Sequence, residues 1–294
     1  MQTLKKRKFI FCLFLLIPAV SLYIFSMVYP LVVGTLPNAF YNWNVVKGVH
    51  KFIGLDNFTR MPSDATFMGS IEFTLILAAC SVVIGNVFSF LIAYMLNEKL
   101  YAKSISRSLF FIPNIMSGVL VAYVWLYIFT GAVPEIGNVI GNKALSEISW
   151  FGSKGMARLS VIIVSVWHSI GYLMMLYIAG LQSVPADIIE AATIDGCGPL
   201  RKITNIQLPL IMPTITICLF VSISGAFKSF DIGQALTKGG PAHMTQTIAM
   251  TIYDTAFSSN KLGYACAQSA VLFIVILLIT SVQLAITRKR EVQL

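Results

Sequence analysis

Charge is scarce in this 294-residue sequence, and the scarcity argues against most soluble folds. Only 11% of the residues are charged, whereas 57% are hydrophobic and the mean hydropathy is +0.80. Soluble globular domains carry roughly 25% charged residues. The composition therefore predicts a membrane protein. At about 20 residues for each helical crossing, the chain has room for six crossings and their loops.

The sequence also lacks the motifs of disulfide frameworks, metal sites and common catalytic centres. Its five cysteines include no CxxC pair, so we expect neither a disulfide framework nor a metal site. No GxxxxGK[ST] loop, HExxH motif or GxSxG elbow occurs. We therefore expect no catalytic residues, metal or cofactor in this chain. An energy source for any transport must come from another chain.

Six apolar runs are long enough to cross the hydrocarbon core as helices. They cover residues 9–33, 73–96, 108–130, 159–181, 208–227 and 264–287. Barrel strands would be about 10 residues long with alternating polarity, which these runs do not show. The sequence therefore predicts an all-α, polytopic transmembrane bundle with six spans. The first run is about twice as long as the apolar part of a signal peptide, so we expect it to be retained as a helix.

The distribution of Lys and Arg predicts the orientation. The formal net charge is +9, from 21 basic and 12 acidic residues. With the N-terminus inside, the inner segments hold Lys5, Lys6, Arg7, Lys8, Lys99, Lys103, Arg107, Arg201, Lys202, Arg288, Lys289 and Arg290. The other basic residues are spread over about twice as much chain. The positive-inside rule therefore places both termini and the 182–207 segment in the cytoplasm, and it explains the basic excess without nucleic acid.

The crossings hold few ionisable residues, which disfavours an ion-coupled carrier because such carriers use charged groups inside the bundle. Glu72, Arg158 and Lys228 lie near the ends of the predicted crossings, and only His168 lies deep within one. Two interpretations of His168 stay open at this point. Its ring contacts a solute, or it is a neutral imidazole that is hydrogen-bonded to a neighbouring helix.

The segment 182–209 predicts a helix-turn-helix elbow between the fourth and fifth crossings. Pro185 suits the first position of a helix, where its missing N–H costs nothing, and Asp187 and Glu190 lie near the positive end of the helix dipole. Gly196 can adopt the left-handed conformation that ends a helix. Pro199 can then open a second short helix that leads into the fifth crossing.

The first helix of the elbow is predicted to expose an apolar surface. That surface consists of Ile188, Ile189, Ala191, Ala192 and Ile194. So short a helix is marginal alone, and an exposed apolar surface outside the membrane indicates a docking site for a partner protein. The alternative is that the elbow packs beneath its own bundle.

The elbow resembles the EAA motif of permease subunits in binding-protein-dependent ABC importers. The residues that carry the likeness are Glu190-Ala191-Ala192, Asp195-Gly196, and then Ile206, Leu208 and Pro209. The resemblance implies the fold of a type I ABC importer permease. It also implies that the elbow is a coupling helix, with Glu190, Ala191, Ala192, Asp195 and Gly196 at the contact with a cytoplasmic ATPase.

The likeness extends over most of the chain and is similar to the carbohydrate branch, particularly the first subunit of maltose-type permeases. Further matching segments are residues 54–58, 110–113, 179–182, 230–231 and 236–241, together with Trp125, Trp167 and Gly171. Cys197 stands where alanine is usual, and Ile203 where an aromatic residue is common. The large outer domain of some maltose-type subunits is missing, so contacts with an external binding protein would use shorter loops.

The resemblance implies a set of partners and a location. They are a second, homologous permease that forms a heterodimer with this chain, two ATP-binding-cassette subunits that hold ATP and Mg, an external solute-binding protein, a carbohydrate, and the lipid of a bacterial inner membrane. Residues 1–64 would form the N-terminal tail, first helix and outer loop, and 65–294 the permease core. The alternatives are a permease for a glycerophosphate or a peptide, and, from another class, an ion-coupled carrier.

Two polar stripes mark a candidate path for the solute. In the fourth crossing Ser165, Ser169 and Tyr172 have the spacing that places side chains on one side of a helix. In the fifth, Ser222, Gly225 and Ser229 repeat the stripe. Hydroxyls and an aromatic ring suit a sugar, and the resemblance implies that Tyr172 and Ser222 occupy pocket positions. The alternative is that small residues at this spacing serve close helix packing.

Overall fold

The computed structural model describes residue 14 and residues 16–97 and 103–289. Cys12, one of the five cysteines, the start of the predicted crossing 9–33, and the basic residues Lys5, Lys6, Arg7, Lys8, Lys99 and Arg290 lie outside the described residues. The described secondary structure is helical apart from one two-stranded hairpin. The prediction of an all-α fold is therefore confirmed, and the hairpin is an addition to it.

Among the described residues, five helices are long and apolar enough to cross a membrane. They are Leu16–Asn38, Ala65–Asn97, Gly118–Val139, Lys154–Gln182 and Leu262–Arg288. A sixth candidate is the pair Pro199–Leu210 and Met212–Phe227, which is bent by 76°. The predicted number of six crossings is reached when this bent pair counts as one.

The chain forms two compact units, Met1–Ser63 with Ile252–Ile274 and Asp64–Thr251 with Val275–Leu294. The elements of the first unit are η1 (Ile24–Val28), η2 (Pro30–Thr35), α2 (Leu36–Asn38), β1 (Tyr41–Asn44), β2 (Val49–Phe52), α3 (Asp56–Thr59), η3 (Met61–Ser63), η7 (Asp254–Ser258) and the start of α17 (Leu262–Arg288). β1 and β2 pair antiparallel, with Tyr41 opposite Phe52. The Asn57 amide nitrogen donates to the carbonyls of Ala39 and Tyr41, at 2.8 and 3.0 Å, and holds the base of the hairpin.

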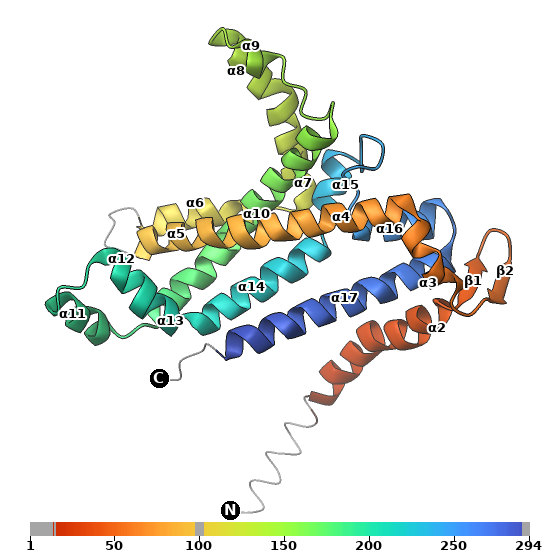
Figure 1. Cartoon of the computed structure of the whole chain (residues 1–294), viewed down its shortest axis with the longest axis horizontal. Coiled ribbons are helices and arrows are strands. Elements are labelled where there is room, and N and C mark those ends of the chain that lie inside the picture. The colour runs from red at the N-terminus through yellow and green to blue at the C-terminus, as the bar shows by residue number, and fades with distance from the viewer. Residues whose placement is uncertain (1–13, 15, 98–102, 290–294) are drawn as a thin grey trace, which may run out of the picture. The chain divides into compact units, whose positions relative to one another are not determined.

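The second unit holds the remaining helices (Figure 1). They are α4 (Ala65–Cys80), η4 (Ser81–Gly85), α5 (Asn86–Asn97), α6 (Lys103–Ile115), α7 (Gly118–Tyr127), η5 (Ile128–Ala132), α8 (Val133–Val139), α9 (Lys143–Ser146), α10 (Lys154–Gln182), α11 (Ala186–Ile194), α12 (Pro199–Lys202), η6 (Ile203–Gln207), α13 (Leu208–Leu210), α14 (Met212–Phe227), α15 (Asp231–Leu236) and α16 (Ile248–Tyr253). Side-chain caps start several of them. Asp64 accepts hydrogen bonds from the first turn of α4, and Ser153 does so for α10.

The third predicted crossing, 108–130, is wrong as a single helix. The chain breaks at Met116 and Ser117, between α6 and α7, and the membrane-length helix runs from Gly118 to Val139 instead. Pro113 lies inside α6, where it lacks the N–H that would support the helix. Ser117 then caps α7, because its hydroxyl accepts from the Leu120 N–H at 3.3 Å.

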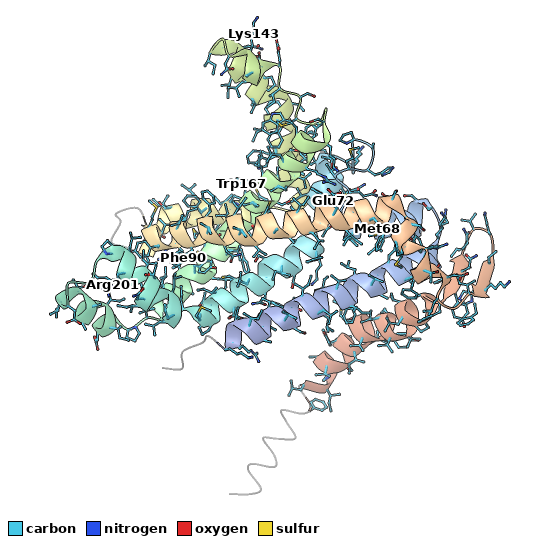
Figure 2. All side chains as sticks on the ribbon, in the orientation of Figure 1. Met68, Glu72, Phe90, Lys143, Trp167 and Arg201 are labelled. Atoms are coloured by element: carbon cyan, nitrogen blue, oxygen red, sulfur yellow. The ribbon has the colours of Figure 1, made fainter. Side chains whose placement is uncertain are left out.

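Helix α10 contributes to two buried apolar clusters of the second unit. One cluster joins Leu173, Met174 and Tyr177 of α10 to residues of α5 and α14. The other joins Val161 and Val164 of α10 to residues of α4, α7 and α15. Figure 2 shows the side chains on these helices, with Glu72 on α4, Phe90 on α5 and Trp167 on α10 labelled. The stretch 165–172 lies on α10 between the two clusters.

Candidate functional site

A cavity of about 290 Å³ opens beside the middle of α10. Its walls come from α4, α10 and α14, from the break between α6 and α7, and from the turn that leads into α15. All six residues of the two predicted polar stripes line it: Ser165, Ser169, Tyr172, Ser222, Gly225 and Ser229. The structure therefore brings both stripes to one cavity. Their roles in binding stay a prediction.

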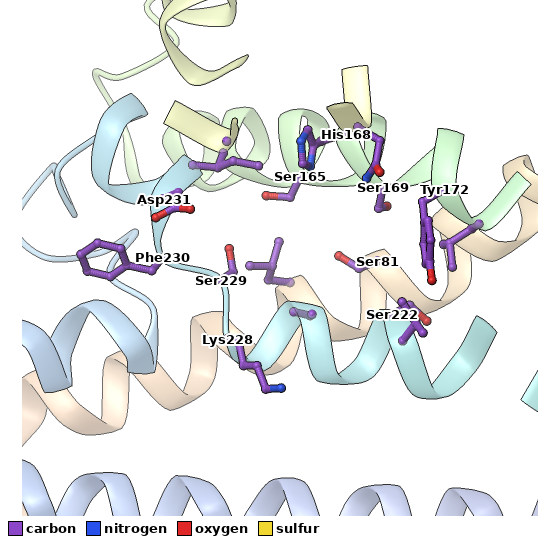
Figure 3. Close-up of a pocket in the computed structure, with 18 residues that line it drawn as sticks. Ser81, Ser165, His168, Ser169, Tyr172, Ser222, Lys228, Ser229, Phe230 and Asp231 are labelled. Atoms are coloured by element: carbon purple, nitrogen blue, oxygen red, sulfur yellow. The ribbon is translucent and has the colours of Figure 1, made fainter. Parts of the chain in front are cut away.

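The α10 wall offers one hydroxyl with no partner and one ring. The Ser165 hydroxyl is buried and has no hydrogen-bond partner among the described residues. The Ser169 hydroxyl, in contrast, donates to the Val166 carbonyl at 2.9 Å. Figure 3 shows the Tyr172 ring on α10 extending toward α14 beside Ser222. A solute in the cavity would meet an available hydrogen-bonding group and an aromatic face.

Ser222 contributes to the opposite wall in a different way, because its hydroxyl is already engaged. It donates to the Cys218 carbonyl at 2.8 Å and accepts from the Asn86 amide nitrogen at 3.0 Å. The Asn86 amide oxygen accepts from the Tyr177 hydroxyl at 2.9 Å. This buried chain of hydrogen bonds joins α5, α10 and α14 at one end of the cavity. Ser222 therefore has a packing role whether or not it also contacts a solute.

His168 lines the same cavity and is hydrogen-bonded. Its Nε2 lies 3.2 Å from the carbonyl oxygen of Met116 at the break between α6 and α7. A carbonyl can only accept, so Nε2 must carry the proton. The predicted hydrogen bond of His168 to a neighbouring segment is confirmed, and its partner is backbone that the helix break leaves available. Because His168 also lines the cavity, its contact with a solute stays a prediction.

The elbow forms as predicted in its main features. α11 runs from Ala186 to Ile194, and a second helix begins at Pro199. Gly196 has φ of +73°, and the Cys197 N–H donates to the Ala192 carbonyl at 2.9 Å, which is the pattern of a left-handed C-terminal cap. One detail is wrong. Pro185 is the capping residue with extended ψ, and the helix starts one residue later.

The apolar surface of the elbow is smaller than the sequence predicts. Ala192 is buried, and Ile188 and Ile189 are half-buried, because this face of α11 packs against its own chain. Ala191 is exposed, as predicted, and so are Glu190, Asp195 and Gly196. Ile194 is 87% exposed, and Leu200 on α12 is 76% exposed. The exposed apolar surface of the elbow therefore centres on Ile194 and Leu200, beside the predicted coupling residues.

One buried cation ties three segments of the second unit together. Arg158 on α10 forms an ion pair with Glu72 on α4 at 2.6 Å. Its Nε donates to the Met244 carbonyl at 2.8 Å, and only 9% of the residue is exposed. Lys154 lies 3.6 Å from the same carboxylate, but it is exposed. Arg158 and Glu72 are thus used in packing, at the same end of the second unit as the α15 wall of the cavity.

Comparison with known families decides how this architecture is classified. Residues 85–291, more than half of the chain, match the family model described as "Binding-protein-dependent transport system inner membrane component". This chain belongs to that family. It is therefore a multi-pass membrane protein, in agreement with its apolar helices.

Relatives of this family member include proteins named as sugar permeases. It is 34% identical to the probable starch degradation products transport system permease protein AmyD of Thermoanaerobacterium thermosulfurigenes, over 99% of each chain. It is 33% identical to the multiple sugar-binding transport system permease protein MsmF of Streptococcus mutans, over 95% of each. A bacterial ABC transporter involved in the import of the acidic polysaccharide alginate has a chain with 22% identity and a TM-score of 0.82, over 98% and 99% of the two chains. That likeness confirms the fold of an ABC importer permease.

Sequence reasoning missed part of the cavity wall in this family member. Asn114 and Gly118 flank the helix break, Lys228 lies at the end of α14, and Asp231 is the first residue of α15. Figure 3 shows Asp231, Ser229 and Lys228 toward the end of the cavity opposite Tyr172. Helical spacing identifies only residues on one straight helix, so it could not place these. Pro113 and the Ser117-Gly118 pair were the available signals for the break.

Proposed function

We propose that this chain is the membrane-spanning permease subunit of an ATP-driven importer, and that it passes a carbohydrate delivered by an external binding protein. The observation that carries the proposal is the cavity, which gathers hydroxyls and the Tyr172 ring beside the middle of α10. Sugars are recognised by hydrogen bonds to their hydroxyls and by stacking on aromatic rings. The names of the AmyD and MsmF relatives support the same solute class.

The proposed assembly contains this chain, a second permease of similar fold, and two ATPase subunits that hold ATP and Mg. The elbow supports a mechanical contact with such an ATPase, because Ile194 and Leu200 are exposed apolar side chains beside a short helix with a fixed C-terminal cap. Both termini and the elbow would face the cytoplasm, and the α15 end of the cavity would face the outside. The permease itself would not be an enzyme.

The proposed mechanism is alternating access. ATP binding would close the two ATPase subunits, and α11 would move with them. The 76° bend between α13 and α14 would carry that movement into the α14 wall of the cavity. Hydrolysis would then return the permease to the state that releases solute inside.

Reconstituted transport tests the proposal. The chain is purified with its co-purifying subunits and placed in vesicles that contain ATP, and radiolabelled maltotriose is supplied with the cognate external binding protein. We expect uptake that requires ATP and the binding protein. Uptake of glycerol phosphate or a peptide in place of sugar would contradict the carbohydrate assignment. Uptake by this chain alone, driven by an ion gradient, would support the secondary carrier instead.

A Tyr172→Ala variant tests the cavity. Loss of the stacking ring should reduce maltotriose uptake at low concentration about tenfold, while the ATPase subunits still co-purify. The matched control is Tyr127→Ala on α7, where the ring is largely exposed and lies away from the cavity. Normal uptake kinetics in the Tyr172 variant would remove this ring from the binding site.

A further inference from the structure

A second cavity, of about 250 Å³, lies in the first unit between the hairpin and the start of α17. It is lined by Asn42, Trp43, Asn44, Lys47, Val49, Arg60, Lys261 and Tyr264. Three of these eight residues are cations, and none is a carboxylate. The solute cavity belongs to the other unit, so the second cavity needs a different explanation.

Tight packing fixes the positions of these residues. A β-carbon on Gly263 would lie 2.9 Å from the Trp43 backbone nitrogen, so only glycine lets the first turn of α17 contact β1 so closely. The Arg60 guanidinium carbon lies 3.8 Å from the centroid of the Tyr264 ring, in a cation–π contact. Asn57 fastens the other side of the hairpin through its two hydrogen bonds to backbone carbonyls. Arg60 is therefore held beside α17, and the hairpin and the start of α17, which carry Lys47 and Lys261, are packed together.

No carboxylate is among the residues that line this cavity with the three cations. The two ion pairs of Glu72 are formed with Lys154 and Arg158, which do not line it. Like charges that converge on one cavity repel each other. An anion bound among them would remove the repulsion and complete the site.

The sequence positions of the lining residues place the cavity at the surface of the membrane. One membrane-length helix ends at Asn38, and another begins at Leu262, next to Lys261. Trp43 and Tyr264 are residue types that favour the headgroup layer. At the hairpin turn, Val46 is 74% exposed beside Lys47. An apolar side chain next to a cation is typical of a segment that touches lipid.

We infer that this cavity binds the phosphate of an anionic phospholipid headgroup. Arg60 can donate two parallel hydrogen bonds to phosphate oxygens, and the two lysines supply further positive charge. The Asn42 side chain offers a neutral hydrogen-bonding group for the glycerol part of the headgroup. The inference requires that the chain spans a membrane, and it does not depend on which solute is carried.

Lipid retention by the intact complex tests this inference. Wild-type complex and a Lys47→Gln, Lys261→Gln double variant are reconstituted in nanodiscs of phosphatidylcholine with a small fraction of phosphatidylglycerol. The complex is then removed from the nanodiscs, and the phosphatidylglycerol that stays bound to it is counted by mass spectrometry. We expect about a 25-fold loss of affinity, roughly fivefold for each cation removed near a membrane surface. The matched control, Lys51→Gln with Lys143→Gln, removes two cations outside the cavity and should retain lipid as the wild type does.

Further measurements separate the sources of phosphate and the other possible occupants. Arg60→Lys keeps the charge but loses the paired hydrogen bonds to phosphate, so it should reduce the retention of phosphatidylglycerol only in part. Equal retention in the double variant and the wild type would overturn the inference. So would a cavity that binds inorganic phosphate or glycerol phosphate but shows no preference for phosphatidylglycerol. A double variant that keeps its lipid but no longer responds to the external binding protein would instead indicate an acidic protein partner, and would also overturn it.

Discussion

The C-terminal cap of α11 gives the sharpest test of the elbow, through the variant Gly196→Val. Gly196 has φ of +73°, whereas Gly198, two residues later, has φ of −67°. A β-carbon at either position would meet nothing within 4 Å. The two glycines therefore differ in backbone conformation and not in available space. Gly198→Val is the matched control.

The size of the effect follows from this difference. A non-glycine residue in the left-handed region costs about 1–2 kcal/mol, and a β-branched residue lies at the unfavourable end of that range. α11 has only nine residues and is marginal alone, so most of this cost should appear as loss of the capped conformation. If only the capped elbow binds the ATPase, its apparent affinity falls by about 5- to 30-fold. The apparent affinity of the Gly196→Asn variant should fall much less, because asparagine tolerates the left-handed region.

The assay is titration of vesicles that contain the permease with the ATPase that co-purifies with the wild type, followed by coupled uptake and hydrolysis. We expect the affinity order wild type, Gly196→Asn, Gly196→Val, with Gly198→Val close to the wild type. Two results would refute the reasoning. One is unchanged affinity in Gly196→Val, and the other is an equal loss in both valine variants, which would show that the segment is sensitive to bulk and not to its cap.

Three further predictions concern the second unit. Ser165→Ala should leave thermal stability unchanged but lower sugar affinity about fivefold, because its hydroxyl has no partner among the described residues. Ser222→Ala should instead lower the free energy of unfolding by about 1 kcal/mol through its lost hydrogen bond, and the reverse pattern would contradict the site. Gly171→Ala should destabilise the protein by about 1–3 kcal/mol in detergent unfolding, because a β-carbon there would clash with the backbone of α6. Gly155→Ala, on the same helix with open space around it, should be neutral or stabilising, and equal effects of the two variants would show that the contact of Gly171 with α6 is unimportant. Arg158→Lys keeps the charge but should cost about 2 kcal/mol through the lost hydrogen bond to the Met244 carbonyl, and unchanged unfolding would count against that role.

The number of spans and the elbow could be predicted because local chemistry determines them. Apolar runs of membrane length have few alternatives to a helix. Gly196 and Pro199 end one helix and start the next without help from tertiary contacts. What escaped prediction depends on tertiary structure. Ala192 became buried because α11 packs against its own chain, and periodicity alone does not reveal which face does so.

The cavity could be predicted only in part, for a related reason. Residues on α10 and α14 follow helical spacing, so the two stripes were visible in the sequence. Asn114, Lys228 and Asp231 come from a helix break and a turn, and no spacing rule brings such segments together. The spacing also could not show that the Ser222 hydroxyl is hydrogen-bonded to Asn86, while the Ser165 hydroxyl has no partner in the part of the chain that the structure describes.

The two glycines at which α10 meets its neighbours have a consequence for how the bundle can move. At Gly171 a β-carbon would come within 3.0 Å of the Phe111 α-carbon of α6, and at Gly180 within 2.8 Å of the Thr214 β-carbon of α14. Helices in such close contact cannot slide along each other without a clash, but they can still rotate about the point where they touch. Each glycine thus marks a pivot point between α10 and the helix that it contacts. A displacement of the elbow would reach the bundle as tilting of whole helices, with the least movement at these two points and the most at the helix ends.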